Sequence, residues 1–359
     1  MTALAGCASS ADGARPAAGP RLSGRRDERT VVRSLRDVYE PYFAIGAAVE
    51  PQTLVTHREI LTRHMASLTA ENHMKLHMVR PFRGTTSYAG ADAIVSFAEE
   101  HGMQVRGHTL LWHEAAPDWF FEDDSGRPAA AGTVRERLRE HIAAIVARYR
   151  GRVYAWDVVN EAVSDSSGTG ILRETRWLET LGPSYLADAF HAAHEADPDA
   201  LLFYNDYSLV EPGKRARTVE LLRGLIADGV PVHGVGMQGH WTMTWPPVDL
   251  IDQAISAYSE LGLRVEITEL DVSFYDWNDH STRFDSFTPG MDEALARRYG
   301  EIFAVLREHA DAIDAVTFWG AADDVSWLNY IPVRGRPNYP LLFDRDHQPK
   351  AAFFAVTVF

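Results

Sequence analysis

The chain has 359 residues, of which 46% are hydrophobic, and its formal net charge is −15 at pH 7. Such a chain can bury one large core. The acidic charge, with no basic stripe, argues against nucleic acid, polyanions and anionic membranes as partners, whereas a neutral substrate fits. No apolar run reaches the roughly 18 residues that a membrane span requires. Cys7 is the one cysteine, so no internal disulfide and no cysteine-based zinc site is expected.

Residues 1–34 are rich in Ala, Gly, Ser, Pro and Arg with little hydrophobic periodicity, which predicts a disordered leader before a catalytic domain over 35–359. The stretch Leu4 to Ser10, around Cys7, is similar to a bacterial lipoprotein cleavage box, although no charged region or apolar core precedes it. Two interpretations stay open. The protein is cytoplasmic as the chain is written, or it is a cell-surface lipoprotein or secreted if the true start lies upstream of Met1.

From Ser34 onward, strand-like and helix-like segments alternate. Eight apolar or β-branched runs are predicted as strands, namely 43–49, 74–79, 104–112, 153–161, 201–207, 232–240, 264–272 and 315–320. Apolar residues at helical spacing predict helices at 60–68, 91–97, 138–146, 185–196, 219–226, 250–261, 299–306 and 351–358. Eight strand-then-helix units predict an α/β fold of the (β/α)₈ TIM barrel type in a single domain. An open doubly wound sheet would need a glycine-rich phosphate turn, which the sequence lacks.

Polar and aromatic residues stand where the predicted strands end, and catalytic groups of TIM barrels gather at the carboxyl ends of the strands. These residues are His108, Trp112, Asn160, Glu161, Asn205, Asp206, Gln238, His240, Glu269, Asp271 and Trp319. We therefore expect them to share one site.

Two of the predicted strands, which are far apart in the sequence, each deliver a glutamate. Glu161 ends the run Trp156 to Glu161, and Glu269 lies in Arg264 to Val272. Two carboxyl groups on a rigid frame are typical of glycosidic-bond cleavage, in which one acts as acid/base. The sequence does not give their separation, so the residues alone leave retaining and inverting mechanisms open.

The surroundings of Glu269 favour its ionised form. Asp271 lies two residues later and therefore on the same face of the strand, and His240 could bridge both carboxylates. Such a chain would orient the imidazole and hold negative charge on Glu269. Asn160 suits a hydrogen bond to a sugar 2-hydroxyl, but Asn160 and Glu161 both face the site only if the strand ends in a bulge or turn.

Further candidate sugar-binding residues are aromatic or polar. Trp112, Trp319 and Trp327 offer flat faces for pyranose rings, the alternative being that they pack beneath loops. Glu71, Asn72 and Lys75 cluster at the predicted start of the second strand, with a helix-capping surface loop as the alternative.

A metal site is not expected among the histidines. His108, His113 and His240 lack the spacing of two histidines on one helix that zinc hydrolases use. Other histidines are expected at the surface or in packing, and these are His57, His64, His73, His77, His191 and His194. We expect neither a catalytic metal nor an organic cofactor.

Five stretches together resemble glycoside hydrolase family 10, the endo-1,4-β-xylanases. They are Glu71 to Lys75, Gly107 to His113, Trp156 to Glu161, Gly236 to His240 and Ile267 to Asp271. The resemblance runs from about Ser34 to Phe359 and implies a (β/α)₈ barrel that hydrolyses β-1,4-xylosidic bonds with retention. It implies Glu161 as acid/base and Glu269 as nucleophile. It also implies sugar binding by Glu71, Asn72, Lys75, His108, Trp112, Asn160, Gln238, His240, Trp319 and Trp327.

Three stretches are most similar to the single-domain, cytoplasmic-type xylanases of this family, which act on short xylo-oligosaccharides. They are Ser67 to Lys75, Leu201 to Tyr207 and Val333 to Asp344. One segment departs from the family, since Leu76 replaces a common aromatic and Val79 to Arg83 replaces the usual acidic Glu-Pro. Arg80 or Arg83 is therefore expected to meet a glucuronic acid branch of the substrate.

The sequence thus predicts a retaining endo-1,4-β-xylanase whose substrate is xylan or xylo-oligosaccharide. The alternatives are a β-1,4-glucanase or cellobiosidase on the same barrel, and a catalytically silent sugar-binding protein. The oligomeric state does not follow from the sequence.

Overall fold

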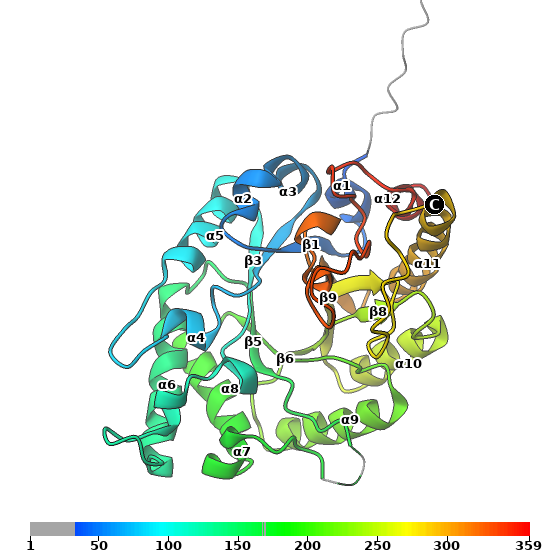
Figure 1. The fold of residues 1–359 in the computed structure, drawn as a ribbon. Helices are drawn as coiled ribbons and strands as arrows, with labels where there is room; N and C mark the ends of the chain where they lie inside the picture. Colours follow the sequence, from blue (N-terminus) through cyan, green and yellow to red (C-terminus); the bar gives the residue numbers. More distant parts are fainter. Residues whose placement is uncertain (1–32, 167, 169) are drawn as a thin grey trace, which may run out of the picture. The chain divides into compact units, whose positions relative to one another are not determined.

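The computed structural model describes residues 33–166, 168 and 170–359. Residues 1–32, with the predicted leader and Cys7, lie outside the described part of the chain. In the described residues, parallel strands close into a barrel, and helices surround this barrel (Figure 1). The barrel strands are β1 (Ala44–Val49), β2 (Ser67–Ala70), β3 (Gln104–Gly107), β5 (Ala155–Asn160), β6 (Leu201–Asp206), β7 (Gly234–Met237), β9 (Arg264–Ser273) and β10 (Ile313–Phe318).

The barrel closes because β10 pairs with β1 on one side and with β9 on the other. Two short strands extend its carboxyl end, since β4 (Leu111–Trp112) pairs with β5 and β8 (His240–Thr242) pairs with β9. The predicted α/β TIM barrel is therefore confirmed.

Helix α1 (Leu35–Tyr39) precedes β1, and the other helices follow barrel strands. Apolar stripes of the helices pack against the barrel, as the helical periodicity predicts. The helices after α1 are α2 (Thr53–Thr56), α3 (Arg58–His64), α4 (Leu76–Val79), α5 (Ala89–Glu100), α6 (Ala131–Arg148), α7 (Arg176–Leu181), α8 (Tyr185–Ala196), α9 (Pro212–Ala227), α10 (Val248–Ser259), α11 (Pro289–Glu308) and α12 (Ala351–Thr357). Short 3₁₀ turns are η1 (His113–Ala115), η2 (Asp118–Phe121), η3 (Asp323–Val325) and η4 (Trp327–Asn329).

Several helices begin where side chains cap them. Thr175 accepts a hydrogen bond from the Leu178 amide at the start of α7, and Thr288 accepts one from Met291 at the start of α11. Glu211 accepts two backbone amides at the start of α9, where Pro212 has no amide hydrogen to leave unpaired.

The predicted second strand was misplaced. The strand is Ser67–Ala70, whereas the predicted run 74–79 contains the short helix α4, Leu76–Val79. A short apolar run cannot be assigned to strand or helix by periodicity alone. The predicted helix 60–68 overlaps the strand, whereas the observed helix α3 ends at His64. Consequently Glu71, Asn72 and Lys75 follow the carboxyl end of a strand rather than precede one.

A buried ionic cluster fills the barrel beneath its carboxyl end. Arg106 of β3 donates to Asp157 of β5 at 2.5 Å and to Glu266 of β9 at 2.6 Å, and its guanidinium lies 4.4 Å from the Phe203 ring centroid. His108 reaches the second oxygen of Asp157 at 2.9 Å. The cluster joins β3, β5 and β9. A shift of one strand would separate these groups and leave an uncompensated buried charge, so the cluster fixes the three strands relative to one another.

None of the helices in the described residues is both long and apolar enough to cross a membrane.

Candidate active site

Strand β5 ends in a backbone turn that aims two consecutive side chains at one place. Glu161 has a φ of 59°, which is uncommon for a residue other than glycine. Its amide donates to the Asn205 carbonyl oxygen at 2.9 Å, and the register between β5 and β6 shifts after Asp157. As a result, Asn160 Nδ2 lies 3.1 Å from Glu161 Oε1, so both side chains face the same side, as the predicted bulge or turn requires.

The Glu161 carboxyl is buried and accepts hydrogen bonds at both oxygens. Trp112 Nε1 donates to Oε2 at 2.8 Å, and Gln238 Nε2 donates to Oε1 at 2.8 Å. Burial first and the nearby Asp206 and Glu269 next raise the pKa of Glu161 to about 7, although the two hydrogen bonds oppose this. A carboxyl with such a pKa holds its proton near neutral pH and can donate it.

The Glu269 carboxyl has the opposite environment. Burial would raise its pKa, but this is outweighed by the His240 hydrogen bond, the nearby His108 imidazole and the Asn205 amide, and the pKa of Glu269 lies well below its usual range. His240 Nε2 lies 3.0 Å from Glu269 Oε2, and His240 Nδ1 lies 3.0 Å from Asp271 Oδ2. Burial lowers the pKa of His240, but the carboxylates of Asp271 and, to a smaller extent, Glu269 outweigh burial and raise this pKa. The imidazole is therefore a cation between two anions.

Two amides connect the carboxyl groups of Glu161 and Glu269. Asn205 Nδ2 donates to Glu269 Oε1 at 2.9 Å and to Asn160 Oδ1 at 2.8 Å, and Asn160 in turn donates to Glu161. Thr268 Oγ1 donates to Asn205 Oδ1 at 2.6 Å, which fixes the orientation of the Asn205 amide. The two carboxyl groups are thus joined by an ordered path of hydrogen bonds.

The segment after β2 brings the predicted residues Glu71, Asn72 and Lys75 to the same end of the barrel. Lys75 Nζ donates to Asn72 Oδ1 at 2.9 Å and lies 4.9 Å from the Trp112 ring centroid. Burial first, then the nearby Glu50, raises the pKa of Glu71 to about 7. Burial also lowers the pKa of Lys75. This is a polar wall whose donors and acceptors suit sugar hydroxyls.

Tryptophans border the carboxyl groups on the other side. Trp319 is buried and its ring centroid lies 5.3 Å from that of His108. Trp327 Nε1 donates to Asp271 Oδ2 at 2.8 Å, and its ring lies 4.9 Å from that of His240. A cavity continues outward from His240 and Asp271 along Trp277, Trp327 and Arg336.

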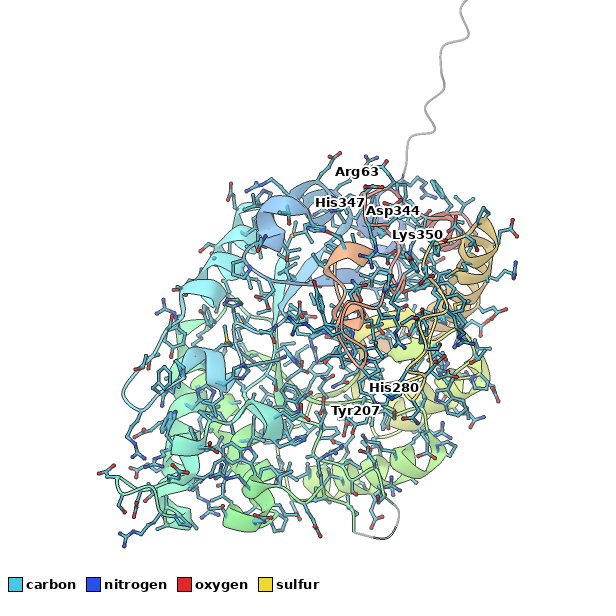
Figure 2. The ribbon with its side chains drawn as sticks, viewed as in Figure 1. Arg63, Tyr207, His280, Asp344, His347 and Lys350 are labelled. Atoms are coloured by element: carbon cyan, nitrogen blue, oxygen red, sulfur yellow. The ribbon has the colours of Figure 1, made fainter. Side chains whose placement is uncertain are left out.

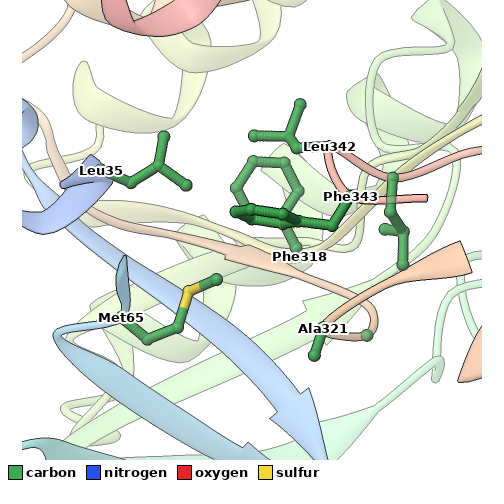
Figure 3. Close-up of a pocket in the computed structure, with 8 residues that line it drawn as sticks. Leu35, Met65, Phe318, Ala321, Leu342 and Phe343 are labelled. Carbon is green, nitrogen blue, oxygen red and sulfur yellow. The ribbon is translucent and has the colours of Figure 1, made fainter. Parts of the chain in front are cut away.

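A second cavity is not a sugar site. It is lined by apolar side chains and one glycine, among them Leu35, Met65, Phe318 and Phe343 (Figure 3). It offers no side-chain donor or acceptor for a hydroxyl group, so it is a packing gap between β10 and the segments around it.

Two site residues are absent from the sequence prediction, and a third has no predicted role. Glu50 follows β1 and accepts hydrogen bonds from Asn72 at 2.7 Å and pairs with His73 at 2.6 Å. Trp277, which is 57% exposed, is not among the predicted residues. Asn205 is among the strand-end residues predicted to share the site, but no role for it follows from the sequence. The strand-end rule would have found Glu50, whereas the position of Trp277 depends on how a long loop folds.

The segment that departs from the family pattern, Leu76 to Arg83, is tied to a neighbouring loop by hydrogen bonds of Arg83. Arg83 donates to the carbonyl oxygens of Trp119, Glu122 and Asp123 and to Asp124 at 3.0 Å. These contacts direct Arg83 to the loop around η2, and the contact of Arg80 or Arg83 with an acidic branch stays a prediction.

Comparisons with known proteins agree with this geometry. Residues 34–358 match the family model described as Glycosyl hydrolase family 10. "Endo-1,4-beta-xylanase B" of Paenibacillus barcinonensis is 46% identical over 327 residues, covering 91% of this chain and 98% of that protein. "Thermostable celloxylanase" of Thermoclostridium stercorarium is 41% identical over 338 residues, covering 90% and 87%.

A solved structure is equally similar. The crystal structure of xylanase XynB from Paenibacillus barcinonensis, complexed with a conduramine derivative, has a TM-score of 0.89 and 46% identity and covers 91% of this chain and 99% of its own. The chain therefore belongs to glycosyl hydrolase family 10 and is a glycoside hydrolase.

Proposed function

We propose that this enzyme is a retaining endo-1,4-β-xylanase in which Glu161 is the acid/base and Glu269 is the nucleophile. The observation that carries the assignment is the contrast between the two carboxyl groups, since the pKa of Glu161 is raised to about 7 and that of Glu269 is lowered. Two neighbouring carboxyl groups with divergent pKa values divide the roles of proton donor and anion. The family membership and the xylanases among its relatives support the substrate class.

In the first step Glu161 gives its proton to the leaving oxygen while Glu269 attacks the anomeric carbon and forms a glycosyl-enzyme ester. Loss of this proton makes Glu161 a carboxylate, which then takes a proton from water. The water adds to the anomeric carbon, and Glu269 leaves. The net configuration at the anomeric carbon is retained because two displacements occur.

Other residues bind the sugar or hold the carboxylates. Asn160 lies between the two glutamates, where it suits a hydrogen bond to the 2-hydroxyl, and His240 with Asp271 keeps Glu269 ionised. Lys75, Asn72 and Glu71 bind hydroxyls of the bound sugar, as do His108 and Gln238. Trp112, Trp319 and Trp327 give apolar ring surface.

The test compares xylohexaose with xylan polymer, and aryl xylobioside with aryl cellobioside. We expect cleavage of the xylosides, with the β-anomer as the first product by proton NMR, and at least a 10⁴-fold loss in Glu269→Ala. Glu260→Gln, at an exposed position that ends α10, is the matched control and should keep full activity. An α-anomer as first product, or full activity of Glu269→Ala, would overturn the proposal.

The second candidate is β-1,4-glucan cleavage, which is favoured by the relative named as a celloxylanase. A higher kcat/KM on aryl cellobioside than on aryl xylobioside would select it. Sugar binding without turnover of either aryl glycoside would instead favour a silent binding protein.

A further inference from the structure

Outside the active site, three side chains from distant parts of the sequence converge at the rim of the barrel. His57 lies between α2 and α3, Asp324 lies in η3, and His347 lies in a hairpin that precedes α12. One ligand atom from each side chain can be chosen so that all three lie within 4.8 Å of one another. Among the described residues, these three side chains form the group whose histidine and carboxylate atoms are close enough together to hold a metal ion.

We propose that His57, Asp324 and His347 bind a divalent transition-metal ion, with Zn²⁺ as the best fit. Two imidazoles and one carboxylate, with a fourth position left for water, form a donor set that zinc accepts in tetrahedral geometry. His57 Nε2 lies 3.0 Å from Asp324 Oδ1, and His347 Nε2 lies 3.5 Å from Asp324 Oδ2. Metal–ligand bonds of about 2.0–2.1 Å place tetrahedral ligands roughly 3.3 Å apart, whereas the three ligand atoms here lie within 4.8 Å of one another, so the widest distance must shorten when an ion binds.

The hydrogen bonds around His57 prepare its Nε2 as a ligand. Thr56 Oγ1 donates its hydrogen to the Gln52 carbonyl oxygen, and it lies 2.8 Å from His57 Nδ1. When Thr56 keeps that hydrogen bond, Nδ1–H of His57 donates to Thr56, and Nε2 is left facing Asp324 Oδ1 at 3.0 Å. A proton or a metal ion between Nε2 and the carboxylate completes this pair, and Nε2 is therefore placed to act as a ligand. A partner on the far ring nitrogen is also what orients metal-binding histidines.

The backbone that carries the other two ligands is fixed in advance. Asp323, the neighbour of Asp324, is buried. Its carboxylate accepts a hydrogen bond from the Lys350 ammonium at 2.7 Å, and its backbone N–H donates a hydrogen bond to the Phe343 carbonyl oxygen at 3.0 Å. His347 has a φ of 63°, an uncommon conformation for a residue with a side chain. That conformation directs its ring against His57, with 4.1 Å between the ring centroids.

The site is open to solvent on one side. The His57 side chain is 1% exposed, whereas those of Asp324 and His347 are 33% and 34% exposed. An ion can therefore enter past His347, whose position beside Asp344 is visible in Figure 2. A bound ion would join the segment after β1, the segment after β10 and the last hairpin. It would thus connect both ends of the barrel sequence, beside the loop that carries Trp327.

The test titrates untagged, chelator-treated full-length protein with ZnCl₂ by calorimetry and with CoCl₂ by visible absorption. Wild type should bind one equivalent of Zn²⁺, raise its Tm by about 2–4 °C at saturation and give the absorption bands of tetrahedral Co²⁺. His347→Gln should weaken Zn²⁺ binding about tenfold or more and lose those bands. His309→Gln is the matched control, because His309 also contacts an aspartate, Asp252, at 2.7 Å but does not belong to the three-residue group.

Three results would overturn the proposal. They are no Zn²⁺ binding by wild type, equal binding by wild type and His347→Gln, and equal loss in His309→Gln and His347→Gln. Circular dichroism and turnover of an aryl xylobioside show whether each variant is folded, since His347 is not part of the xylan site. If His347→Gln proves unfolded, Asp324→Asn gives the same comparison.

Discussion

Asn205 donates one amide hydrogen to Glu269 Oε1 at 2.9 Å and the other to Asn160 at 2.8 Å. One side chain therefore touches the expected nucleophile and orders the amide beside the expected acid. Since the hydrogen bond favours the ionised form of Glu269, Asn205 serves as a positioning residue for the reaction. Its loss should affect charge on Glu269 as well as geometry.

Asn205→Ala should lower kcat on an aryl xylobioside by roughly 10- to 100-fold, because a hydrogen bond to a charged group contributes about 1.5–3 kcal/mol. The acid limb of the pH profile should also move to higher pH as the pKa of Glu269 rises. A purely structural role would lower kcat without moving that limb. Asn205→Asp tests the charge, because a second carboxylate there should reduce activity further.

Replacement of His240 should shift the same limb further. The nucleophile must be ionised, so activity falls as the pH drops through the pKa of Glu269, which His240 holds low. In His240→Gln the cation is lost while one donor is kept, and the limb should move upward towards the ordinary range of a carboxyl group. The measurement is kcat/KM against pH. An unchanged acid limb would contradict this account of His240.

Gln238→Leu should move the alkaline limb. Activity falls as the pH rises through the pKa of Glu161, about 7, because the acid is then deprotonated. Gln238 donates to the ionised carboxylate and lowers that pKa, so its loss should shift the alkaline limb upward while kcat also decreases. A downward shift would show that the Gln238 hydrogen bond does not favour the anion.

Gly236→Ala tests how closely the strands approach beneath the site. A Cβ at this position would lie 2.3 Å from Asn205 Oδ1 and 2.9 Å from Thr268 Cγ2. Overpacking of this kind costs about 1–3 kcal/mol, and it displaces the Asn205 amide. We expect a lower Tm and a reduced kcat. Gly224→Ala on α9, where a Cβ meets nothing within 4 Å, is the control and should keep kcat, while its Tm stays the same or rises because alanine favours a helix over glycine.

The sequence predicted most of the barrel because strands and helices alternate with distinct periodicities and because helix ends carry glycines and caps. It failed at the second strand, since Ser67–Ala70 is a four-residue strand and the run after Met74 is equally apolar. It also predicted that polar strand ends would meet. The path through Asn205 could not be predicted, because that path depends on the register shift after Asp157 and on the turn at Glu161.

The rim cluster was missed for a different reason. His57, Asp324 and His347 have no common spacing, and His57 was expected only at the surface or in packing. They meet because β10 pairs with β1, which brings the two ends of the barrel sequence together. Such proximity follows from closure of the sheet and leaves no local pattern.

Covalent trapping of the glycosyl-enzyme shows whether Glu269 forms the bond to the sugar. The enzyme is incubated with a 2-deoxy-2-fluoro-xylobioside that carries a good leaving group, then digested and analysed by mass spectrometry. We expect one fluoroxylobiosyl group on the peptide that contains Glu269 and none on the peptide that contains Glu161. A label on any other residue, or active enzyme that inverts its substrate and takes no label, would contradict this prediction.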